Sequence, residues 1–503
     1  MSKFSFKNSI LSFMMQKRIS NIDEFCNNPI KIQEKVLNFL ISKGGNTAFG
    51  KAHHFNAIND YVHFSKNIPI RTYEEFSIFI ERARKGEQNV LWPGKIKWFA
   101  KSSGTTNAQS KFIPITQESL KNCHFKGGKD MLSLYGNNFS NLDVYNGKGL
   151  MLGGSLKKSS TGNYKDGDLS AILLDEFPVW VNYHRIPDID TALMEDWEDK
   201  LERIAKQAVK TNITNLAGVP SWMLILLKRV LAISGKKNIS EVWPNLELYM
   251  HGGVNFEPYK AQFKTLIPSE KMNYLEGYNA SEGFIGIQDK NPSEGLLLML
   301  DYGIFYEFIP MEKYKKGIRE ASPLKDVQLN TDYALVISTN GGLWRYLIGD
   351  VVRFTTAKPY RIKIIGRTKS FLNTFGEELV VENSDSALLA ACNKYNASIK
   401  DYTVAPIYIN SNSGGHQWFI EFSKAPKDIQ LFKQELDNKL KVFNSDYAAK
   451  RTKDLILGDP EIIHIQNNEF YKWLKKNNRL GGQYKIPRLS NNRKIADEIL
   501  ALL

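Results

Sequence analysis

The sequence predicts an α/β protein with two domains, a large one built on mixed sheets and a small α+β one at the C-terminal end. Three observations lead to this fold class. The chain has 503 residues, which is too long for one hydrophobic core. Helical and strand-like segments alternate up to residue 233, and short apolar strands separated by turns follow up to residue 365. After residue 369, a compact mixture of helices and strands completes the chain.

The composition fits a folded protein and excludes several classes. Hydrophobic residues make up 42% and aromatic residues 12% of the chain, which suffices for packed interiors and excludes disorder. No apolar run is long enough to span a membrane, and the N-terminus lacks the pattern of a secretory signal. The three cysteines are far apart, which indicates a reducing environment and argues against disulfides or a zinc site. We therefore expect a cytoplasmic protein.

The net charge of +14 suggests an anionic partner or simply a lysine-rich surface. The lysines are dispersed, and no stretch interleaves arginines with aromatics as single-strand binders do. We therefore expect no nucleic-acid partner, although the charge would favour a small anionic substrate.

The first part of the chain contains mainly helices. A helix is expected over residues 10–43, ending at Gly44-Gly45, and Thr72 and Glu75 form a capping box for a helix up to Arg84. Further helices are expected over residues 117–135 after Thr116, over 190–210, and from Ser221 to 233. Strands are expected at 149–153 and 214–217.

The second part is dominated by strands. They are expected at 246–250, 272–275, 284–288, 296–300, 305–309, 334–338, 343–348 and 361–365. The C-terminal unit should contain helices at 385–395, 428–443, 468–476 and 494–502, and strands at 402–409, 417–422 and 462–465.

A cluster of hydroxyls at residues 99–116 is the first candidate site. It contains Ser102, Ser103, Thr105 and Thr106 around Gly104, and Lys111 follows. Hydroxyls and backbone N–H groups of a turn can wrap a polyphosphate, and a lysine can neutralise part of its charge. The spacing matches neither a Walker loop nor a dinucleotide fingerprint. A polar surface turn is the alternative interpretation.

Two further stretches follow predicted strands. In Tyr278-Asn279-Ala280-Ser281-Glu282-Gly283, we expect a loop whose tyrosine ring can lie against a purine and whose glutamate can hold Mg²⁺. Asp350, after Gly349, is expected between two apolar strands, where its carboxylate can accept hydrogen bonds from ribose hydroxyls. For both stretches an ordinary polar turn is the alternative.

The proposed domain boundary and the C-terminus carry two more candidates. The small and polar residues from Gly366 to 370 suit a hinge, or an ordinary inter-domain turn. Lys485 is the lysine of the glycine-containing loop at 481–488, and a mobile cation there could stabilise charge on a departing phosphate. A solvated surface lysine is the alternative. The histidines show no metal-binding spacing, although His251 could line a pocket.

The order of these motifs resembles the adenylate-forming superfamily, which includes acyl-CoA synthetases, luciferases and adenylation domains. The amino-acid sequence at residues 102–106, 218–222, 345–353 and 482–488 is similar to that of the Gretchen Hagen family of acyl-acid amido synthetases. The resemblance implies an adenylation domain over residues 1–367, with a β-barrel-like part, and a mobile C-terminal lid over 368–503. It also implies ATP and Mg²⁺ as cofactors, and a carboxylic acid and an amine, presumed to be an amino acid, as substrates.

The same resemblance assigns roles to residues at the matching positions. Lys485 and Glu282 would be catalytic, and Glu282 would also hold the metal. ATP would be bound by Ser102, Ser103, Gly104, Thr105, Thr106, Lys111, Val254, Asn255, Tyr278, Asn279, Ala280, Ser281, Glu282, Asp350 and Arg367. The acyl acid would contact Lys126, Lys129, Val219, Trp222 and His251.

Three departures from the plant members affect the substrate. The helix after the hydroxyl cluster carries lysines in place of a clamping arginine, and Glu377-Glu378 stands where plant members have a lysine. The chain is also short, which suits a bacterial member. The hormone substrates are therefore not expected to carry over. A thioester ligase of the same fold and an inactive nucleotide-binding relative remain the alternatives.

Overall fold

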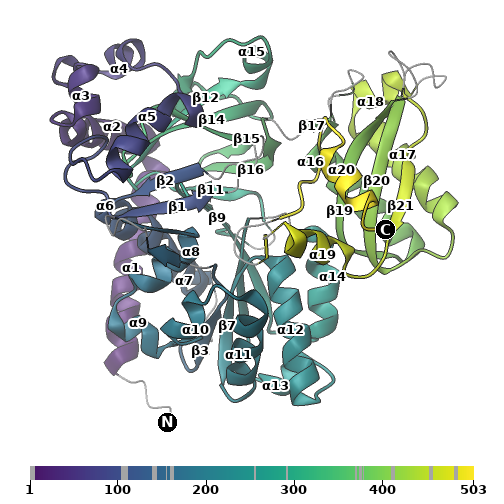
Figure 1. Ribbon diagram of the computed structural model, residues 1–503. Helices are drawn as coiled ribbons and strands as arrows, with labels where there is room; N and C mark the ends of the chain where they lie inside the picture. Colours follow the sequence, from purple (N-terminus) through teal and green to yellow (C-terminus); the bar gives the residue numbers. More distant parts are fainter. Residues whose placement is uncertain are drawn as a thin grey trace. The chain divides into compact units, whose positions relative to one another are not determined.

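The computed structural model describes residues 6–102, 111–138, 144–154, 156–158, 164–253, 256–290, 293–368, 371–372, 377, 379–408, 414–451, 457–477, 479–480 and 485–503. None of the described helices is long and apolar enough to cross a membrane. The chain divides into two compact units (Figure 1). Unit 1 comprises Met1–Gly218, Trp243–Gly253 and Glu270–Ile364, and unit 2 comprises Val219–Val242, Val254–Ser269 and Ile365–Leu503. The domain division at residue 367 stays a prediction.

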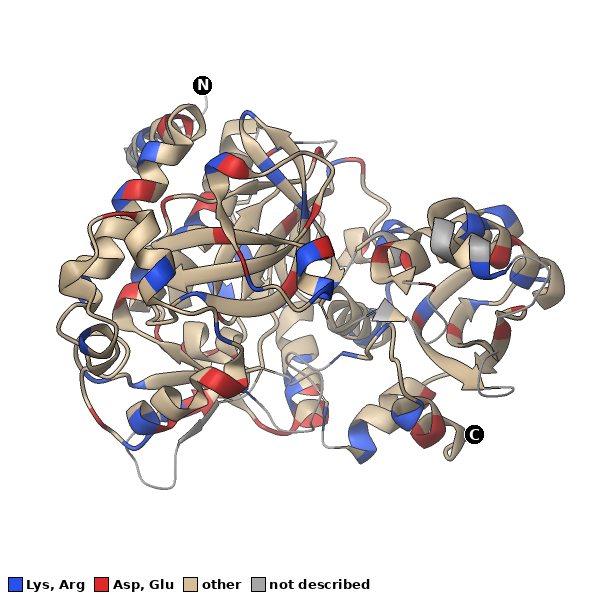
Figure 2. Cartoon of the chain, turned by 90° about the horizontal axis from the view of Figure 1, so that it is seen from above, with Lys and Arg blue, Asp and Glu red and all other residues tan. Residues whose placement is uncertain are grey.

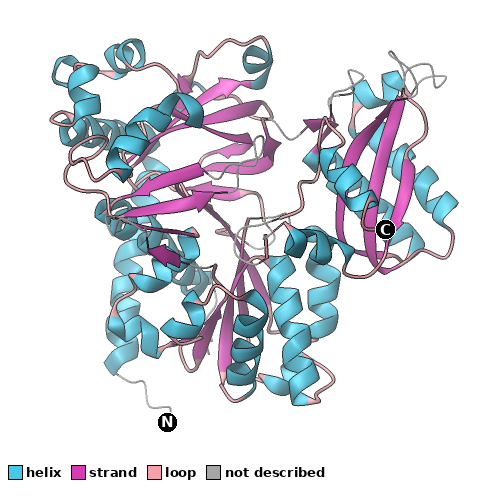
Figure 3. Cartoon of the chain, viewed as in Figure 1, coloured by secondary structure: helices cyan, strands magenta, loops and turns pink. Residues whose placement is uncertain are grey.

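Unit 1 contains most of the described helices and strands, which Figure 3 distinguishes by colour. Its helices are α1 (Phe6–Asn27), α2 (Pro29–Gly44), α3 (Ala48–Ala52), η1 (Phe55–Ala57), α4 (Tyr61–Asn67), α5 (Tyr73–Arg84), α6 (Gln117–Ser119), η2 (Leu120–His124), α7 (Phe125–Asn138), α8 (Leu169–Asp175), α9 (Val179–Tyr183), α10 (Ile189–Leu193), α11 (Trp197–Val209), α15 (Met311–Lys315) and η3 (Leu324–Asp326). Its strands are β1 (Trp98–Ser102), β2 (Lys111–Ile115), β3 (Lys148–Met151), β4 (Leu156–Lys158), β5 (Lys165–Gly167), β6 (Arg185–Ile186), β7 (Ile213–Gly218), β8 (Leu248–His251), β9 (Asn273–Ala280), β10 (Gly283–Ile287), β11 (Leu296–Leu298), β12 (Ile304–Pro310), β13 (Ser322–Pro323), β14 (Asp332–Thr339), β15 (Tyr346–Ala357) and β16 (Tyr360–Arg367), the last of which runs into unit 2.

The described strands of unit 1 form a 12-stranded sheet in the order β13-β12-β14-β15-β16-β11-β10-β9-β8-β7-β3-β6, and a 4-stranded sheet, β2-β1-β5-β4. Strands β6, β3, β7, β8 and β9 run parallel to their neighbours. From β9 to β10, β11 and β16 the pairing is antiparallel, as it is from β15 to β14 and β12. Strand β9 therefore joins a parallel half to an antiparallel half, which confirms the predicted mixed α/β fold. The barrel-like part stays a prediction.

Unit 2 is built on a 3-stranded sheet, β19-β20-β21. Its strands are β17 (Phe371–Leu372), β18 (Leu379–Val380), β19 (Ser398–Tyr408), β20 (Gly414–Lys424) and β21 (Glu461–Ile465). Its helices are α12 (Pro220–Ser234), α13 (Ile239–Val242), α14 (Glu257–Leu266), α16 (Val381–Tyr395), α17 (Ile429–Phe443), α18 (Ser445–Lys450), α19 (Glu469–Lys476) and α20 (Lys494–Leu500). Trp418, Tyr402 and Phe432 are fully buried in the core of this unit.

Local signals explain the helix boundaries that the sequence predicted. The capping box of α5 is present, because the Thr72 N–H donates to the Glu75 carboxylate at 2.7 Å and the Thr72 hydroxyl accepts the Glu75 N–H. Thr116 caps the helix that follows it, accepting the Ser119 N–H at 3.0 Å. Basic and acidic residues are interspersed along the chain (Figure 2).

Several predicted boundaries were wrong. The helix expected over residues 10–43 is two helices, because Pro29 at the start of α2 cannot continue the preceding turn. The helix expected over 190–210 is likewise α10 and α11, with Asp196 capping the second. Helix α12 begins at Pro220, which presets the backbone angle of a first helical residue, and Ser221 is not its cap.

Two errors concern candidate site residues. Residues 278–280 belong to strand β9, so the expected loop shrinks to the two-residue turn Ser281-Glu282 between β9 and β10. Asp350 lies inside the long strand β15 and not between two strands. The strand bulges there: Ala334 pairs with Val351 but Val336 pairs with Leu347, and Gly349 adopts a φ of 91°. A side-chain-free glycine suits that left-handed backbone.

Candidate functional site

The carboxyl ends of the parallel strands β3, β7, β8 and β9 define one edge of the large sheet. Because parallel strands end on the same side, the residues that follow them share this edge, where α/β proteins commonly bind ligands. His251 ends β8 and is buried. The next residue, Gly252, has no room for a side chain, because a Cβ at its position would lie 2.2 Å from the Gly277 carbonyl oxygen of β9. The backbone after His251 is therefore held directly against the strand that carries the Tyr278 motif.

A hydrogen bond joins two of the predicted nucleotide motifs. The Tyr278 hydroxyl of β9 donates to the Asp350 carboxylate of β15, across 72 residues of sequence. The Tyr278 side chain is buried, and Asp350 sits on the β15 bulge. A carboxylate offers about four lone-pair directions, so it can accept several hydrogen bonds at once. The arrangement fits a side chain that accepts further hydroxyl donors, as a ribose would supply.

The turn Ser281-Glu282 directly follows β9, the strand that carries Tyr278. Both residues are buried. Among the described residues, the Ser281 hydroxyl has no hydrogen-bond partner. A buried hydroxyl without a partner is costly, so this one suits a polar ligand such as a phosphate oxygen. Glu282 is a single carboxylate, and within the described ranges no group of three or more His, Cys, Asp or Glu side chains could hold a metal ion. This donor set fits Mg²⁺, which takes one or two carboxylates together with phosphates and water.

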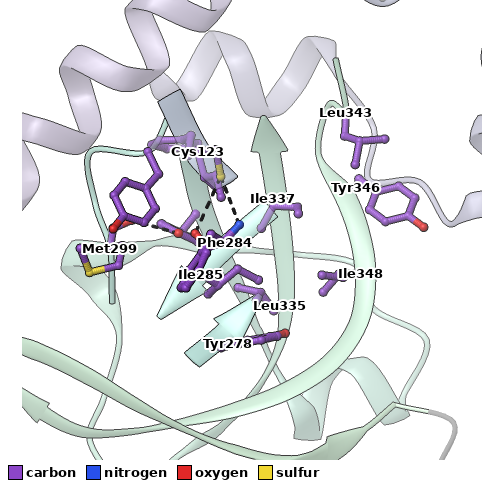
Figure 4. Packing of buried hydrophobic residues seen from close by; sticks show 14 of the residues in the cluster. Cys123, Tyr278, Phe284, Ile285, Met299, Leu335, Ile337, Leu343, Tyr346 and Ile348 are labelled. Carbon is purple, nitrogen blue, oxygen red and sulfur yellow. Dashed lines mark hydrogen bonds between the residues drawn. The ribbon is translucent and has the colours of Figure 1, made fainter. Parts of the chain in front are cut away.

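The β9–β10 hairpin is fastened to a π-helical turn, η2. The Phe284 N–H donates to the Cys123 sulfur at 3.1 Å, as Figure 4 shows. One residue on, His124 Nδ1 lies 2.9 Å from the Asn279 amide oxygen. Single π-helical turns frequently occur at functional sites. Sequence patterns gave no sign of η2 or of either contact, because both depend on residues more than 150 positions apart.

Burial shifts the pKa values of Cys123 and His124, the two residues of η2 that contact the hairpin. The His124 side chain is 3% exposed, and this burial lowers its pKa to about 4, although the bond to Asn279 opposes the shift. The imidazole is therefore neutral at pH 7, with its Nδ1 in a hydrogen bond to the Asn279 side chain. Burial likewise raises the pKa of the Cys123 thiol to about 12, so it acts as a packed, uncharged group.

Helix α7, which follows η2, packs closely on the same hairpin. A Cβ at Gly127 would lie 2.3 Å from the Phe284 ring. Lys126 pairs with Asp301 at 2.8 Å, and Arg18 of α1 joins Asp301 to Asp130 of α7. The Lys126 ammonium is thus engaged within the protein, whereas Lys129 is exposed. Their predicted contacts with an acyl acid stay predictions.

The remaining predicted site residues lie on other elements or outside the described residues. Ser102 and Lys111 pair with each other on β1 and β2, and they flank the stretch that holds Ser103, Gly104, Thr105 and Thr106. Those four residues, and Val254 and Asn255, lie outside the described residues. Arg367, Val219, Trp222 and Lys485 belong to unit 2. That Lys485 works at the Tyr278 hairpin therefore stays a prediction.

Two motif residues turn out to have structural partners. Arg345 is buried, its guanidinium bonds Glu307 at 2.8 Å, and it donates to the carbonyls of Ser65 and Ile68. Glu377 is fully buried and pairs with His416 at 2.9 Å. Glu377 therefore has its partner within unit 2, while Glu378 lies outside the described residues.

Models of one known protein family match most of the chain. Models of the GH3 family match along the chain: the N-terminal domain over residues 18–272, the central domain over 297–367 and the C-terminal domain over 382–494. The chain belongs to the GH3 family. This confirms the family predicted from the motifs, and with it the enzyme class: the chain is an acyl-acid amido synthetase, a ligase.

GH3 relatives cover nearly the whole chain. Indole-3-acetic acid-amido synthetase GH3.4 of Arabidopsis thaliana is 25% identical over 94% of this chain and 91% of its own length. Jasmonoyl–L-amino acid synthetase JAR6 of Nicotiana attenuata is 24% identical over 95% and 93%. No relative here identifies the source of the chain, so the bacterial origin stays a prediction.

Solved structures show the same fold. The GH3.15 acyl acid amido synthetase superimposes with a TM-score of 0.80 at 18% identity, covering 96% of this chain and 95% of that one. A 2-hydroxyisobutyryl-CoA ligase bound to its acyl-adenylate superimposes with a TM-score of 0.57 at 11% identity, covering 97% and 91%. The large unit and the smaller C-terminal sheet therefore have the fold of these ligases.

Proposed function

We propose that this GH3 protein uses ATP and Mg²⁺ to convert a carboxylic acid into an acyl-adenylate, and then transfers the acyl group to the amino group of an amino acid. The observation that carries the proposal is the bond between Tyr278 and Asp350. It unites the two motifs assigned to adenine and ribose, next to a turn whose Ser281 and Glu282 suit phosphate and Mg²⁺.

The reaction needs positioning and charge neutralisation more than a covalent nucleophile. In the first half-reaction a carboxylate oxygen attacks the α-phosphorus of ATP and pyrophosphate leaves. In the second, the amine attacks the acyl carbon, AMP leaves and the amine gives up a proton. Mg²⁺, when bound, would neutralise phosphate charge. Of the chain's own residues, Asp350 would orient the ribose, the Ser281 hydroxyl would donate to phosphate, and Lys485 would balance the charge that develops at the α-phosphate.

We further propose the division implied by the family resemblance, with an adenylation domain over residues 1–367 that includes a barrel-like part, and a mobile lid over 368–503. Arg367, at the end of β16, would lie at the hinge. Phosphate binding by the stretch between β1 and β2 belongs to the same proposal, as do nucleotide contacts of Val254 and Asn255. A hinge would let Lys485 serve the first half-reaction and then withdraw.

The acid substrate should be identified by testing many carboxylic acids and not only the hormones in the names of the relatives. Lys126 is engaged by Asp301, and the helix carries no arginine in its place. We expect an acid whose carboxylate is held by other groups. Indole-3-acetic acid and jasmonic acid belong in the test because they are named for the relatives.

A panel of carboxylic acids with ATP, Mg²⁺ and hydroxylamine tests the proposal directly. An accepted acid gives a hydroxamate together with AMP. Repeating the assay with amino acids, and then with CoA, distinguishes an amide from a thioester. No hydroxamate and no AMP from any acid would refute the enzymatic function, and a thioester in place of an amide would refute the acceptor.

The Lys485→Ala variant tests the assigned charge role. It should slow adenylation by about a hundredfold or more, because a preorganised cation at developing charge is typically worth that much. ATP affinity, measured by calorimetry, should change little. Loss of ATP affinity in proportion to the rate would contradict the role given to Lys485.

A further inference from the structure

The backbone that follows Lys485 is fixed to strand β19. The Thr403 hydroxyl donates to the Pro487 carbonyl at 2.6 Å, and the Val404 N–H donates to the Arg488 carbonyl at 2.9 Å. The Ser490 N–H in turn donates to the Val404 carbonyl at 3.1 Å. These bonds give the segment the pairing of a short parallel bridge to β19, so its position is set by a regular strand.

The Arg488 side chain adds an anchor with several partners. Its guanidinium pairs with the Asp401 carboxylate and donates to the Tyr402 carbonyl at 3.1 Å. It also donates to the Tyr259 hydroxyl at 2.9 Å and lies over the Tyr402 ring, 4.4 Å from its centre. The side chain is only 14% exposed. A planar guanidinium held by a carboxylate, a carbonyl, a hydroxyl and a ring has little freedom to reorient.

Tyr259 comes from a distant part of the sequence, helix α14. Its ring is buried, and the same helix makes a second bond to the β19 backbone, from the Gln262 amide to the Ile399 carbonyl at 2.8 Å. All these elements belong to unit 2. The anchor therefore fixes α14, β19 and the segment after Lys485 to one another.

Lys485 is exposed and lies three residues before the anchor. Three extended residues span at most about 10 Å. The intervening Ile486 is buried, and the Pro487 ring fixes one backbone angle. The Lys485 backbone thus has little room to move independently of Arg488.

We propose that Arg488, held by Asp401 and Tyr259, is the positioning residue for Lys485 and sets the rate of adenylation. The inference rests on the proposed function of Lys485. Because Lys485 balances charge at the α-phosphate, its displacement slows the first half-reaction. Attack of an amine on a preformed acyl-adenylate does not involve that charge and stays unchanged.

The test uses Arg488→Met, Arg488→Lys and Tyr259→Phe in the full-length protein. Arg493→Met is the matched control, because Arg493 also donates to a β19 carbonyl, that of Pro406 at 2.8 Å, but within the described part of the chain it has no hydrogen bond to α14. ATP–pyrophosphate exchange reports the first half-reaction. Amide formation from a synthetic acyl-adenylate reports the second.

For Arg488→Met we expect exchange to slow by about tenfold to a hundredfold, since small displacements of a catalytic group cost that much. Tyr259→Phe, which removes one oxygen, should have a smaller effect in the same direction, and Arg488→Lys should restore part of the rate. The KM for ATP should stay within about threefold, and the second half-reaction should match wild type in every variant. Wild-type exchange in Arg488→Met, or equal loss of both half-reactions, would overturn the proposal.

Trypsin cleavage after Lys485 gives a readout that needs no activity. Cleavage requires the chain to leave β19, so Arg488→Met and Tyr259→Phe should be cut there faster than wild type and Arg493→Met. If the wild-type protein activates no acid, the proposed function fails, and the cleavage rates still decide whether Arg488 fixes the Lys485 segment. Equal rates in all four proteins would refute the anchor.

Discussion

Burial of His124 should make the stability of this protein depend on pH in a defined direction. The pKa of His124 is about 4 in the folded state, against 6.5 for an unperturbed histidine. Between these values the unfolded chain binds more protons, so acidification favours unfolding. A difference of about 2.5 pKa units corresponds to about 3 kcal/mol. The free energy of unfolding should therefore begin to fall below about pH 6.5 and lose about 3 kcal/mol from this side chain by pH 4.

Histidine labelled with ¹³C at the Cε1 position allows a direct measurement. The His124 resonance is the one missing from the spectrum of His124→Gln, in which an amide replaces the ring. It should keep its neutral chemical shift down to pH 5. Urea unfolding at several pH values should show a shallower acid dependence in the variant than in wild type. The exposed His184 provides the control, as His184→Gln. A His124 resonance that titrates near pH 6.5 would refute the reasoning.

Three further predictions concern stability. Burial lowers the pKa of Lys200 to about 8 from 10.5, so between these pH values the unfolded chain binds more protons than the folded one. The free energy of unfolding of wild type should therefore rise by about 3 kcal/mol from pH 8 to 10.5, and that of Lys200→Met should not. The same pH dependence in urea unfolding of both proteins would contradict this. Gly127→Ala should lower stability by about 1–3 kcal/mol by pressing on an aromatic ring, whereas Gly128→Ala, with open space, should not; equal melting temperatures would argue against the close packing. Glu307→Leu should cost about 3–5 kcal/mol in urea unfolding, because it leaves the buried Arg345 charge without its carboxylate, and a loss below about 1 kcal/mol would contradict the buried pair.

The predictable parts of the fold are those with a local cause. The capping box of Thr72 and Glu75 needs only two residues three positions apart, and most strands are recognisable in the sequence as apolar runs between turns. Pro29 shows where periodicity fails as a guide. The apolar pattern continues through this residue, but a helix cannot, because proline has no backbone N–H to donate.

The candidate site was predictable as a set of motifs but not as an arrangement. The order of the motifs indicated the family, which the domain models confirm. Nothing local shows that Tyr278 bonds Asp350, because that contact depends on a sheet assembled from distant strands. The role of His124 was missed for the same reason: its partner lies 155 residues away.

Strand β9 has a practical consequence for altering the acid that this GH3 protein accepts. The parallel strands β8, β7 and β3 lie in this order on one side of it and end in connecting segments, which generally tolerate changes in length. Its antiparallel partner follows after a turn of only two residues, Ser281-Glu282, and an inserted residue there would shift the register of the hairpin. Mutant libraries for new acids should therefore keep the length of the hairpin turn constant and place insertions in connecting segments elsewhere in the sheet.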